Sequence, residues 1–268
     1  MTHPSRRAVA ATPPSDEAAP IGELKICGLA AVRARFERDP ASILRVYFDL
    51  ATSRRIGAMS KALAAGHKIY RCVEPAELEK VAGSVHHGGI VAVVPALLPR
   101  PVRPEDIAAW AARRESLLIL DRIGNSHNLG ALARSAAFFG IPRLVLTADP
   151  AAARPNDAAY RVAEGGLEEL EVRAVSRLAP FLRDLAGAGY EVIGAATRGG
   201  PALRASKGET KPLTAIVLGN EESGLAPEVA AACTRLVTIT GPGRMESLNV
   251  SVAGAVLMWE FIGRKSAK

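Results

Sequence analysis

Short apolar runs alternate with helix-like segments through the second half of this chain, and this alternation restricts the possible folds more than any other feature. The runs that we interpret as strands are Leu117–Leu120, Arg143–Thr147, Leu170–Ala174, Tyr190–Ala195, Thr214–Leu218 and Leu236–Ile239. Helical patterns cover 125–139, 176–186 and 247–262. Such alternation predicts the α/β class, with a parallel sheet covered by helices on both faces. The last helix is apolar nearly all round and is expected to be mostly buried.

Composition divides the chain into four parts. Residues 1–22 are rich in Ala, Pro, Ser and Thr and are expected to form a disordered tail. Residues 23–95 alternate between strand and helix patterns and predict a small α/β domain. Residues 96–114 follow Pro95 and contain Pro99, Pro101 and Pro104, which predict a linker with a short helix at its end. Residues 115–268 form the larger domain.

Charge and cysteine usage limit the classes of function. The chain carries 34 Lys and Arg against 27 Asp and Glu, and residues 21–95 hold 11 basic and 7 acidic side chains. That excess fits either a polyanion-binding domain or an ordinary solvated surface. Cys27, Cys72 and Cys233 lie far apart, which argues against a disulfide scaffold or a metal site. The chain has no apolar run of the roughly 18 residues that span a bilayer, and its start lacks the apolar core of a signal peptide, so we expect a cytoplasmic protein.

Three polar loops follow predicted strands of the large domain. They cover residues 121–130, 218–225 and 239–249, and each ends at or near the start of a helix. Ligands of open parallel sheets bind outside the carboxyl ends of the strands. Glycines and free backbone N–H groups in these loops permit close approach of a ligand.

Familiar nucleotide-binding motifs are missing from these loops. The chain has no GxxxxGK[ST] motif, and Gly241-Pro242-Gly243 is followed by Glu246 where a GxGxxG motif has its third glycine. A standard dinucleotide fold is therefore disfavoured. Another kind of nucleotide-binding α/β protein stays open as an alternative.

Taken together, the three loops resemble those of the SpoU/TrmH family of RNA ribose methyltransferases. The first matches N-x-G-x-x-x-R through Asn128, Gly130 and Arg134, and the second matches L-G-x-E-x-x-G from Leu218 to Gly224. The third matches S-L-N-V-S-V-A over residues 247–253. Order and spacing both agree. The first domain is also similar to the small RNA-binding domain found in many members of that family, by its Lys25–Gly28 start and its His86–Val91 end.

The resemblance implies an expected fold, cofactor and partners. It implies a parallel sheet with a C-terminal trefoil knot, a homodimer with the site near the subunit interface, and a structured RNA as substrate, either rRNA or tRNA. It implies S-adenosylmethionine as the cofactor and no metal. By match, the cofactor-binding residues are Gly219, Ile239 and Leu248, with Leu218 and Asn220 nearby.

The resemblance also assigns roles to polar residues of the site. Arg134 matches the catalytic arginine, and because a guanidinium resists deprotonation, contact with a phosphate or a developing alkoxide suits it better than a role as base. Asn128 either orients Arg134 or caps the helix. Glu221 anchors Arg134 or a substrate hydroxyl, unless it is a solvated carboxylate. Ser247 acts at the site or only caps the last helix, and Asn249 holds the cofactor loop or the target ribose.

Two functions follow from this interpretation. The leading one is a methyltransferase that uses S-adenosylmethionine to methylate the ribose 2′-hydroxyl of rRNA or tRNA. The alternative is a non-catalytic RNA-binding paralogue of the same fold. The presence of Arg134, Glu221, Ser247 and Asn249 counts against decay of the site.

Overall fold

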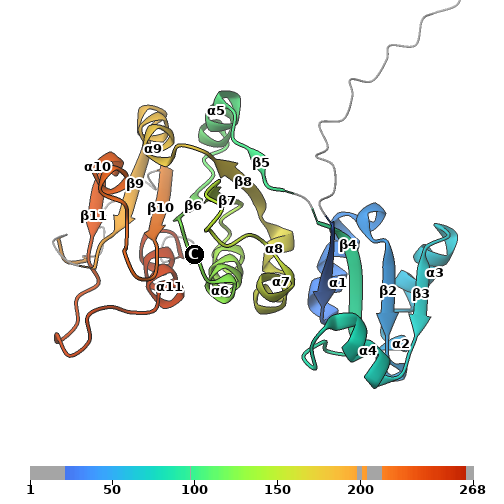
Figure 1. Ribbon diagram of the computed structural model, residues 1–268. Coiled ribbons are helices and arrows are strands. Elements are labelled where there is room, and N and C mark those ends of the chain that lie inside the picture. Colours follow the sequence, from blue (N-terminus) through green and yellow to red (C-terminus); the bar gives the residue numbers. More distant parts are fainter. Residues whose placement is uncertain (1–21, 97, 198–200, 204–212, 264–268) are drawn as a thin grey trace, which may run out of the picture.

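The computed structural model describes residues 22–96, 98–197, 201–203 and 213–263, which form two domains (Figure 1). We call residues 22–96 the small domain and residues 98–263 the large domain. The tail expected over residues 1–22 lies outside the described residues, except for Gly22, which begins the first strand. Within the described ranges, no helix is long and apolar enough to cross a membrane.

The large domain is built on one parallel sheet. Seven strands lie in the order β11-β9-β10-β6-β7-β8-β5, and every neighbouring pair is parallel. This confirms the predicted α/β architecture. The strands are β5 (Arg100–Pro101), β6 (Leu117–Asp121), β7 (Arg143–Thr147), β8 (Glu171–Val175), β9 (Tyr190–Ala195), β10 (Leu213–Gly219) and β11 (Arg235–Val237).

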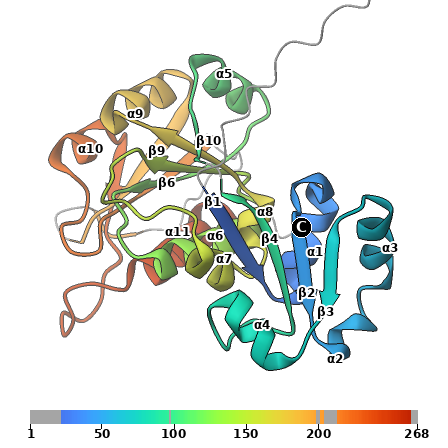
Figure 2. The same ribbon diagram turned by 45° about the vertical axis from the view of Figure 1, so that its right-hand side comes forward.

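Helices cover both faces of this sheet (Figures 1 and 2). Leu118 and Leu120 of β6 face one helical layer, and Leu117 and Ile119 face the other, as the two-residue period of a strand requires. The first layer holds α6 (Ser126–Phe138), α7 (Asp157–Ala163), α8 (Gly166–Glu169) and α11 (Val250–Phe261). The second holds α5 (Pro104–Ala112), α9 (Leu178–Gly187) and α10 (Pro227–Ala232). The sequence pattern did not predict α7, α8 or α10, because each is too short to show a clear helical period.

Part of the expected linker belongs to the large domain. Arg100 and Pro101 pair with β8, and α5 packs into the second helical layer. Trp110 of α5 is only 1 % exposed, and the guanidinium of Arg143 lies 5.8 Å from the centre of its ring. Burial of a tryptophan fixes this helix firmly on the sheet.

The last helix is less buried than its composition predicts. Gly254, Leu257, Met258 and Phe261 are buried, but Val252 and Trp259 are each 50 % exposed. The helix also begins at Val250 rather than at Ser247. The expectation of a mostly buried helix is therefore wrong for one face, because a helix on the outside of a sheet has only one face to pack.

The small domain has a mixed four-stranded sheet. Its strands are β1 (Gly22–Cys27), β2 (Arg45–Phe48), β3 (Ile69–Cys72) and β4 (Ile90–Ala96), in the order β1-β4-β2-β3. β4 is antiparallel to both neighbours, and β2 is parallel to β3. The surrounding helices are α1 (Leu29–Arg38), η1 (Pro40–Ser42), α2 (Leu50–Ser53), α3 (Gly57–Ala65) and α4 (Pro75–Ala82).

The two domains meet where α1 packs against α7 and α8 (Figure 2). Arg35 of α1 lies 2.9 Å from a carboxylate oxygen of Glu168, and its guanidinium donates to the Tyr160 hydroxyl at 3.4 Å. The backbone N–H of Lys25 donates to Asp157 at 2.9 Å.

Glu168 is 3 % exposed, and burial raises its pKa to about 7 although Arg35 opposes the rise. The interface therefore contains a buried carboxyl group that titrates near neutrality.

This titration predicts a specific pH dependence of stability. Below about pH 7 the folded state keeps a proton on Glu168, whereas the unfolded chain releases it near pH 4.5. Stability is thus highest below the unfolded pKa and decreases as the pH rises through the folded pKa. Between pH 5 and 8 we expect a loss of about 1–3 kcal/mol that is absent in Glu168→Gln. Urea unfolding at both pH values measures it, and an unchanged pH slope in the variant would contradict the assignment.

Candidate active site

Glu221 joins the first two polar loops. One carboxylate oxygen accepts from the backbone N–H of Gly124 at 3.0 Å. The other accepts from the backbone N–H of Asn125 at 3.1 Å and from the side-chain amide of Asn128 at 2.9 Å. Burial by itself would raise the pKa of Glu221, but these hydrogen bonds outweigh it and hold the pKa below its ordinary value. Glu221 is therefore an ionised anchor of the loop that precedes α6.

Asn249 joins the third loop to the same cluster. Its side-chain amide donates to the side-chain oxygen of Asn128 at 3.1 Å. Its own oxygen accepts from the backbone N–H of Ser251 at 2.8 Å and caps α11. Asn128, Glu221 and Asn249 thus form one hydrogen-bonded chain, which we call the Asn–Glu–Asn chain.

Two capping roles considered from the sequence are wrong. The cap of α6 is Asn125, whose side chain accepts from the backbone N–H of His127 at 2.8 Å, so Asn128 lies inside the first turn. The cap of α11 is Asn249, so Ser247 is not a cap. The side chain of Asn128 contacts Glu221 instead of capping the helix. Ser247 lines the cavity that is described below.

The end of β10 turns sharply at Gly219 and Asn220. A Cβ atom on Gly219 would lie 2.2 Å from the carbonyl carbon of Gly224, so only glycine fits there. The Asn220 side chain accepts from the backbone N–H of Glu222 at 3.0 Å and donates to the carbonyl of Arg122 at 2.8 Å. These contacts hold the second loop in one shape beside the first.

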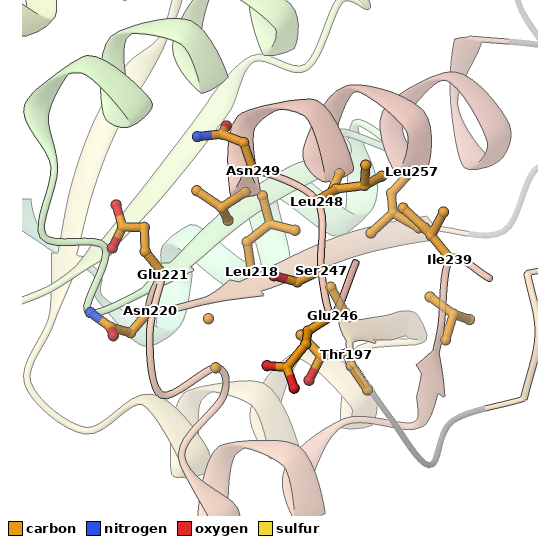
Figure 3. A pocket seen from close by; sticks show the side chains of 17 residues that line it. Thr197, Leu218, Asn220, Glu221, Ile239, Glu246, Ser247, Leu248, Asn249 and Leu257 are labelled. Carbon is orange, nitrogen blue, oxygen red and sulfur yellow. The ribbon is translucent and has the colours of Figure 1, made fainter. Parts of the chain in front are cut away.

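A cavity of about 310 Å³ lies at the carboxyl ends of β9, β10 and β11 (Figure 3). Every cofactor-binding residue expected from the sequence lines it: Leu218, Gly219, Asn220, Ile239 and Leu248. So do three of the expected catalytic residues, Glu221, Ser247 and Asn249. The sequence analysis assigned no role to the further lining residues Ala195, Ala196, Thr197, Gly224, Val237, Glu246, Val250, Ala253 and Leu257, although four of them lie in the matched motifs or the third loop. The stretch 195–197 was detectable, because it follows β9, and the carboxyl ends of parallel strands share one edge.

The lining suits a ligand with an apolar part and a positive charge. Leu218, Ile239 and Leu248 supply apolar walls, while Glu221 and Glu246 bring carboxylates to the rim (Figure 3). A carboxylate near a partly desolvated site favours a cation. In the part of the chain that the structure describes, there is no group of three or more His, Cys, Asp or Glu side chains that could hold a metal ion.

Arg134 lies apart from this cavity. It follows Asn128 by six helical residues, which is a rotation of roughly 240° around α6 and directs it to another face. Its guanidinium contacts Glu164 at 2.9 Å, and both side chains are more than half exposed. Glu221 therefore anchors Asn128 and the loop before α6, and Glu164 contacts Arg134.

Both domains match known families. Residues 115–259 match the SpoU rRNA Methylase family, and residues 25–99 match the family RNA 2'-O ribose methyltransferase substrate binding. One relative is the 23S rRNA (guanosine-2'-O-)-methyltransferase RlmB of Nitrosomonas europaea, which is 33 % identical over 91 % of this chain and 92 % of the relative. Another is the uncharacterized tRNA/rRNA methyltransferase YfiF of Escherichia coli O157:H7, which is 33 % identical over 89 % of this chain and 68 % of the relative.

Solved structures have the same fold. The AdoMet-bound rRNA methyltransferase from Sinorhizobium meliloti superposes with a TM-score of 0.72 at 20 % identity, over 92 % of this chain and 88 % of that one. The SpoU methyltransferase AviRb from Streptomyces viridochromogenes, in complex with AdoMet, gives a TM-score of 0.72 at 20 % identity over 92 % of each chain.

The three hydrogen bonds to Glu221 predict a loss of stability when its charge is removed. We expect Glu221→Gln to lower the free energy of unfolding by about 1–3 kcal/mol at pH 7, because a neutral amide is a weaker acceptor for the loop amides. Since the folded pKa is lowered, this contribution is present above the unfolded pKa and disappears as the pH falls through the folded pKa. Urea unfolding between pH 3 and 7 measures both effects.

Glu222→Gln is the matched control, because it removes the same charge from the neighbouring exposed position. If both substitutions lower the free energy of unfolding equally, the loss comes from removing one negative charge and not from the hydrogen bonds of Glu221.

Proposed function

The chain belongs to the SpoU rRNA methylase family, and from this we propose that it transfers a methyl group from S-adenosylmethionine to a ribose 2′-hydroxyl of rRNA or tRNA. The observation that carries the proposal is the cavity at the ends of β9, β10 and β11, which lies directly beside the Asn–Glu–Asn chain. A cofactor site and a set of polar side chains for a substrate thus adjoin each other.

The residues around the cavity fit S-adenosylmethionine. Leu218, Ile239 and Leu248 form walls suited to an adenine ring, and Glu246 offers a carboxylate to a positively charged group. Gly219, Gly224 and other residues of the second and third loops also line the cavity, and their backbone N–H and C=O groups would suit polar contacts with the nucleoside. When bound, this cofactor supplies a methyl group on a positively charged sulfur.

The substrate is proposed to be RNA, with rRNA favoured over tRNA. The small domain matches a family described as substrate binding for RNA 2'-O ribose methyltransferases, and its sequence has a basic excess. The relative RlmB is named for methylation of guanosine in 23S rRNA, which supports a structured rRNA. With such a substrate we place the protein in the cytoplasm.

The side chains of the site have distinct proposed tasks. The 2′-oxygen must approach the methyl carbon in line while its proton leaves. The pKa of Glu221 is lowered and its oxygens accept three hydrogen bonds, so it holds the loop rather than taking that proton. Ser247 and Asn249 border the cavity and orient the ribose, and Asn128 holds Asn249. Arg134 stays cationic and stabilises the phosphate and the negative charge that develops on the 2′-oxygen.

A homodimer is the proposed assembly. Phe138 on α6 is 83 % exposed, and Val252 and Trp259 on α11 are each 50 % exposed, so an apolar surface extends over two neighbouring helices. Exposed apolar patches of this kind mark interaction sites. Arg134 and Phe138 are four residues apart and share a face of α6. A second copy packed on this face would bring Arg134 of one protomer towards the cavity of its partner.

The C-terminal trefoil knot is also part of the proposal. β11 lies at one edge of the large sheet, whereas the helix that follows it, α11, packs against β10 and α6 nearer the middle (Figure 1). The chain must therefore return past β9 after leaving β11. This route is consistent with a knotted C-terminal segment.

The main test uses labelled S-adenosylmethionine with purified unmodified rRNA and tRNA. We expect label in one RNA pool, on a ribose 2′-oxygen identified by nucleoside mass spectrometry. Arg134→Ala should lower kcat by about 100-fold or more, because it removes the cation at the developing charge. Its affinity for S-adenosylmethionine should be unchanged, since Arg134 does not line the cavity.

The alternatives give different results in the same experiment. Cofactor and RNA binding without methyl transfer would favour a non-catalytic RNA-binding paralogue. Absence of cofactor binding would exclude the methyltransferase and leave another nucleotide-binding α/β protein.

The dimer is tested at Trp259. We expect Trp259→Asp to convert a species of twice the chain mass into single chains in sedimentation equilibrium, because a charge in an apolar interface is costly to bury. Leu50→Asp is the control, because Leu50 is also a large exposed apolar residue but lies on the small domain. Dissociation by both substitutions, or by neither, would contradict a dimer through α6 and α11.

A further inference from the structure

We propose that Glu164 is a positioning residue for Arg134, and that the α7–α8 turn around it connects Arg134 to the docked small domain. This inference rests on the proposed methyl transfer and adds a residue that lies outside the three matched loops. Figures 1 and 2 show α7 and α8 between α6, which carries Arg134, and α1 of the small domain.

The contact itself leaves most of the guanidinium available. The Nη1 atom of Arg134 lies 2.9 Å from Oε1 of Glu164, and their side chains are 56 % and 59 % exposed. A guanidinium has five N–H donors in a rigid planar fork. One edge can therefore rest on Glu164 while the remaining donors face an incoming phosphate or ribose oxygen.

The backbone at Glu164 is unusual for a residue with a side chain. Its φ is +45° and that of Gly165 is +96°, so two successive residues are left-handed where α7 ends. Glycine is the residue best suited to this position at the end of a helix. Glutamate adopts this conformation less readily than glycine, and the contact with Arg134 gives a reason for a charged side chain at this position.

The turn is packed directly against the backbone of α6. A Cβ atom on Gly166 would lie 2.7 Å from the Cα atom of Arg134 and 3.0 Å from its backbone nitrogen. Only glycine permits this approach. The backbone of the turn that carries Glu164 is therefore fixed relative to the Cα atom of Arg134.

The other side of the same turn contacts the small domain. A Cβ atom on Gly165 would lie 3.4 Å from the Cα atom of Ala31 in α1. One helical turn further along α1, Arg35 contacts the buried carboxyl group of Glu168 in α8 at 2.9 Å. Docking of the small domain and support of Arg134 thus depend on one short unit, α7–α8.

An exposed ion pair contributes little to stability, so its effect should appear in catalysis. Without Glu164, the long side chain of Arg134 samples many rotamers and must be ordered again in each turnover. We expect Glu164→Gln to lower kcat about 10-fold. The KM for RNA should stay equal or fall, because one negative charge is removed near the RNA.

The experiment compares the full-length protein with Glu164→Gln and three further variants in steady-state methyl transfer. Glu164→Asp keeps the charge and should recover part of kcat. Glu164→Gly suits the left-handed backbone and should keep or raise the Tm while lowering kcat, which separates positioning from folding. Glu169→Gln is the matched control, because it removes the same charge from an exposed site on α8, and it should leave kcat within twofold.

A second readout does not depend on activity. ¹⁵N relaxation of the Arg134 Nε–H group should show greater mobility in Glu164→Gln than in the parent protein. Unchanged relaxation, or a kcat of Glu164→Gln within twofold of the parent, would overturn the proposal. A rise in kcat with a lower KM would also overturn it, because Glu164 would then restrain Arg134 in a resting position. If Arg134 is more mobile in Glu164→Gln than in the parent protein, but the parent protein transfers no methyl group, the proposed function is refuted and the restraint of Arg134 by Glu164 is not.

Discussion

Close approach of helix backbones around α6 is the constraint on which the rest of the large domain depends. A Cβ atom on Gly130 of α6 would lie 2.4 Å from the carbonyl oxygen of Ala159 in α7, and one on Gly166 of α8 would lie 2.7 Å from the Cα atom of Arg134 further along α6. Interiors packed this closely transmit small displacements. Asn128 and Arg134 both lie on α6, so the same packing determines the position of two polar groups that face different directions.

The strands of the large domain, and the meeting of the three polar loops at one edge of its sheet, could be predicted from the sequence. Runs such as Leu117–Leu120 are apolar on both faces, and β6 to β11 follow them closely. The rule that ligand loops gather at the carboxyl ends of parallel strands predicted that the three loops meet there. Leu218, Ile239 and Leu248 were chosen from the family resemblance, and all three line the cavity at that edge. The strands and the meeting of the loops were predictable because they depend on local pattern and sheet geometry.

What could not be predicted depends on contacts between segments far apart in the chain. Asn125, Asn128 and Asn249 are all plausible helix caps by residue type, and only the structure shows that Asn128 instead contacts Glu221. The short helices α7 and α8 carry too few residues for a clear period, so the partner of Arg134 was missed with them. The exposed face of α11 was overlooked because residue type records hydrophobicity and not which face is covered.

The short strand β5 and helix α5 have a consequence for how the two domains can be separated. β5 covers the outer edge of β8, and its proline cannot donate a ladder hydrogen bond, so the sheet ends there without an open pairing edge. The family match to the large domain begins at residue 115, which leaves β5 and α5 outside it. A fragment cut at that boundary would lose Trp110 from the core and expose β8 to pairing with other chains. A fragment meant to hold the complete large domain must therefore include Arg100 and the residues that follow it.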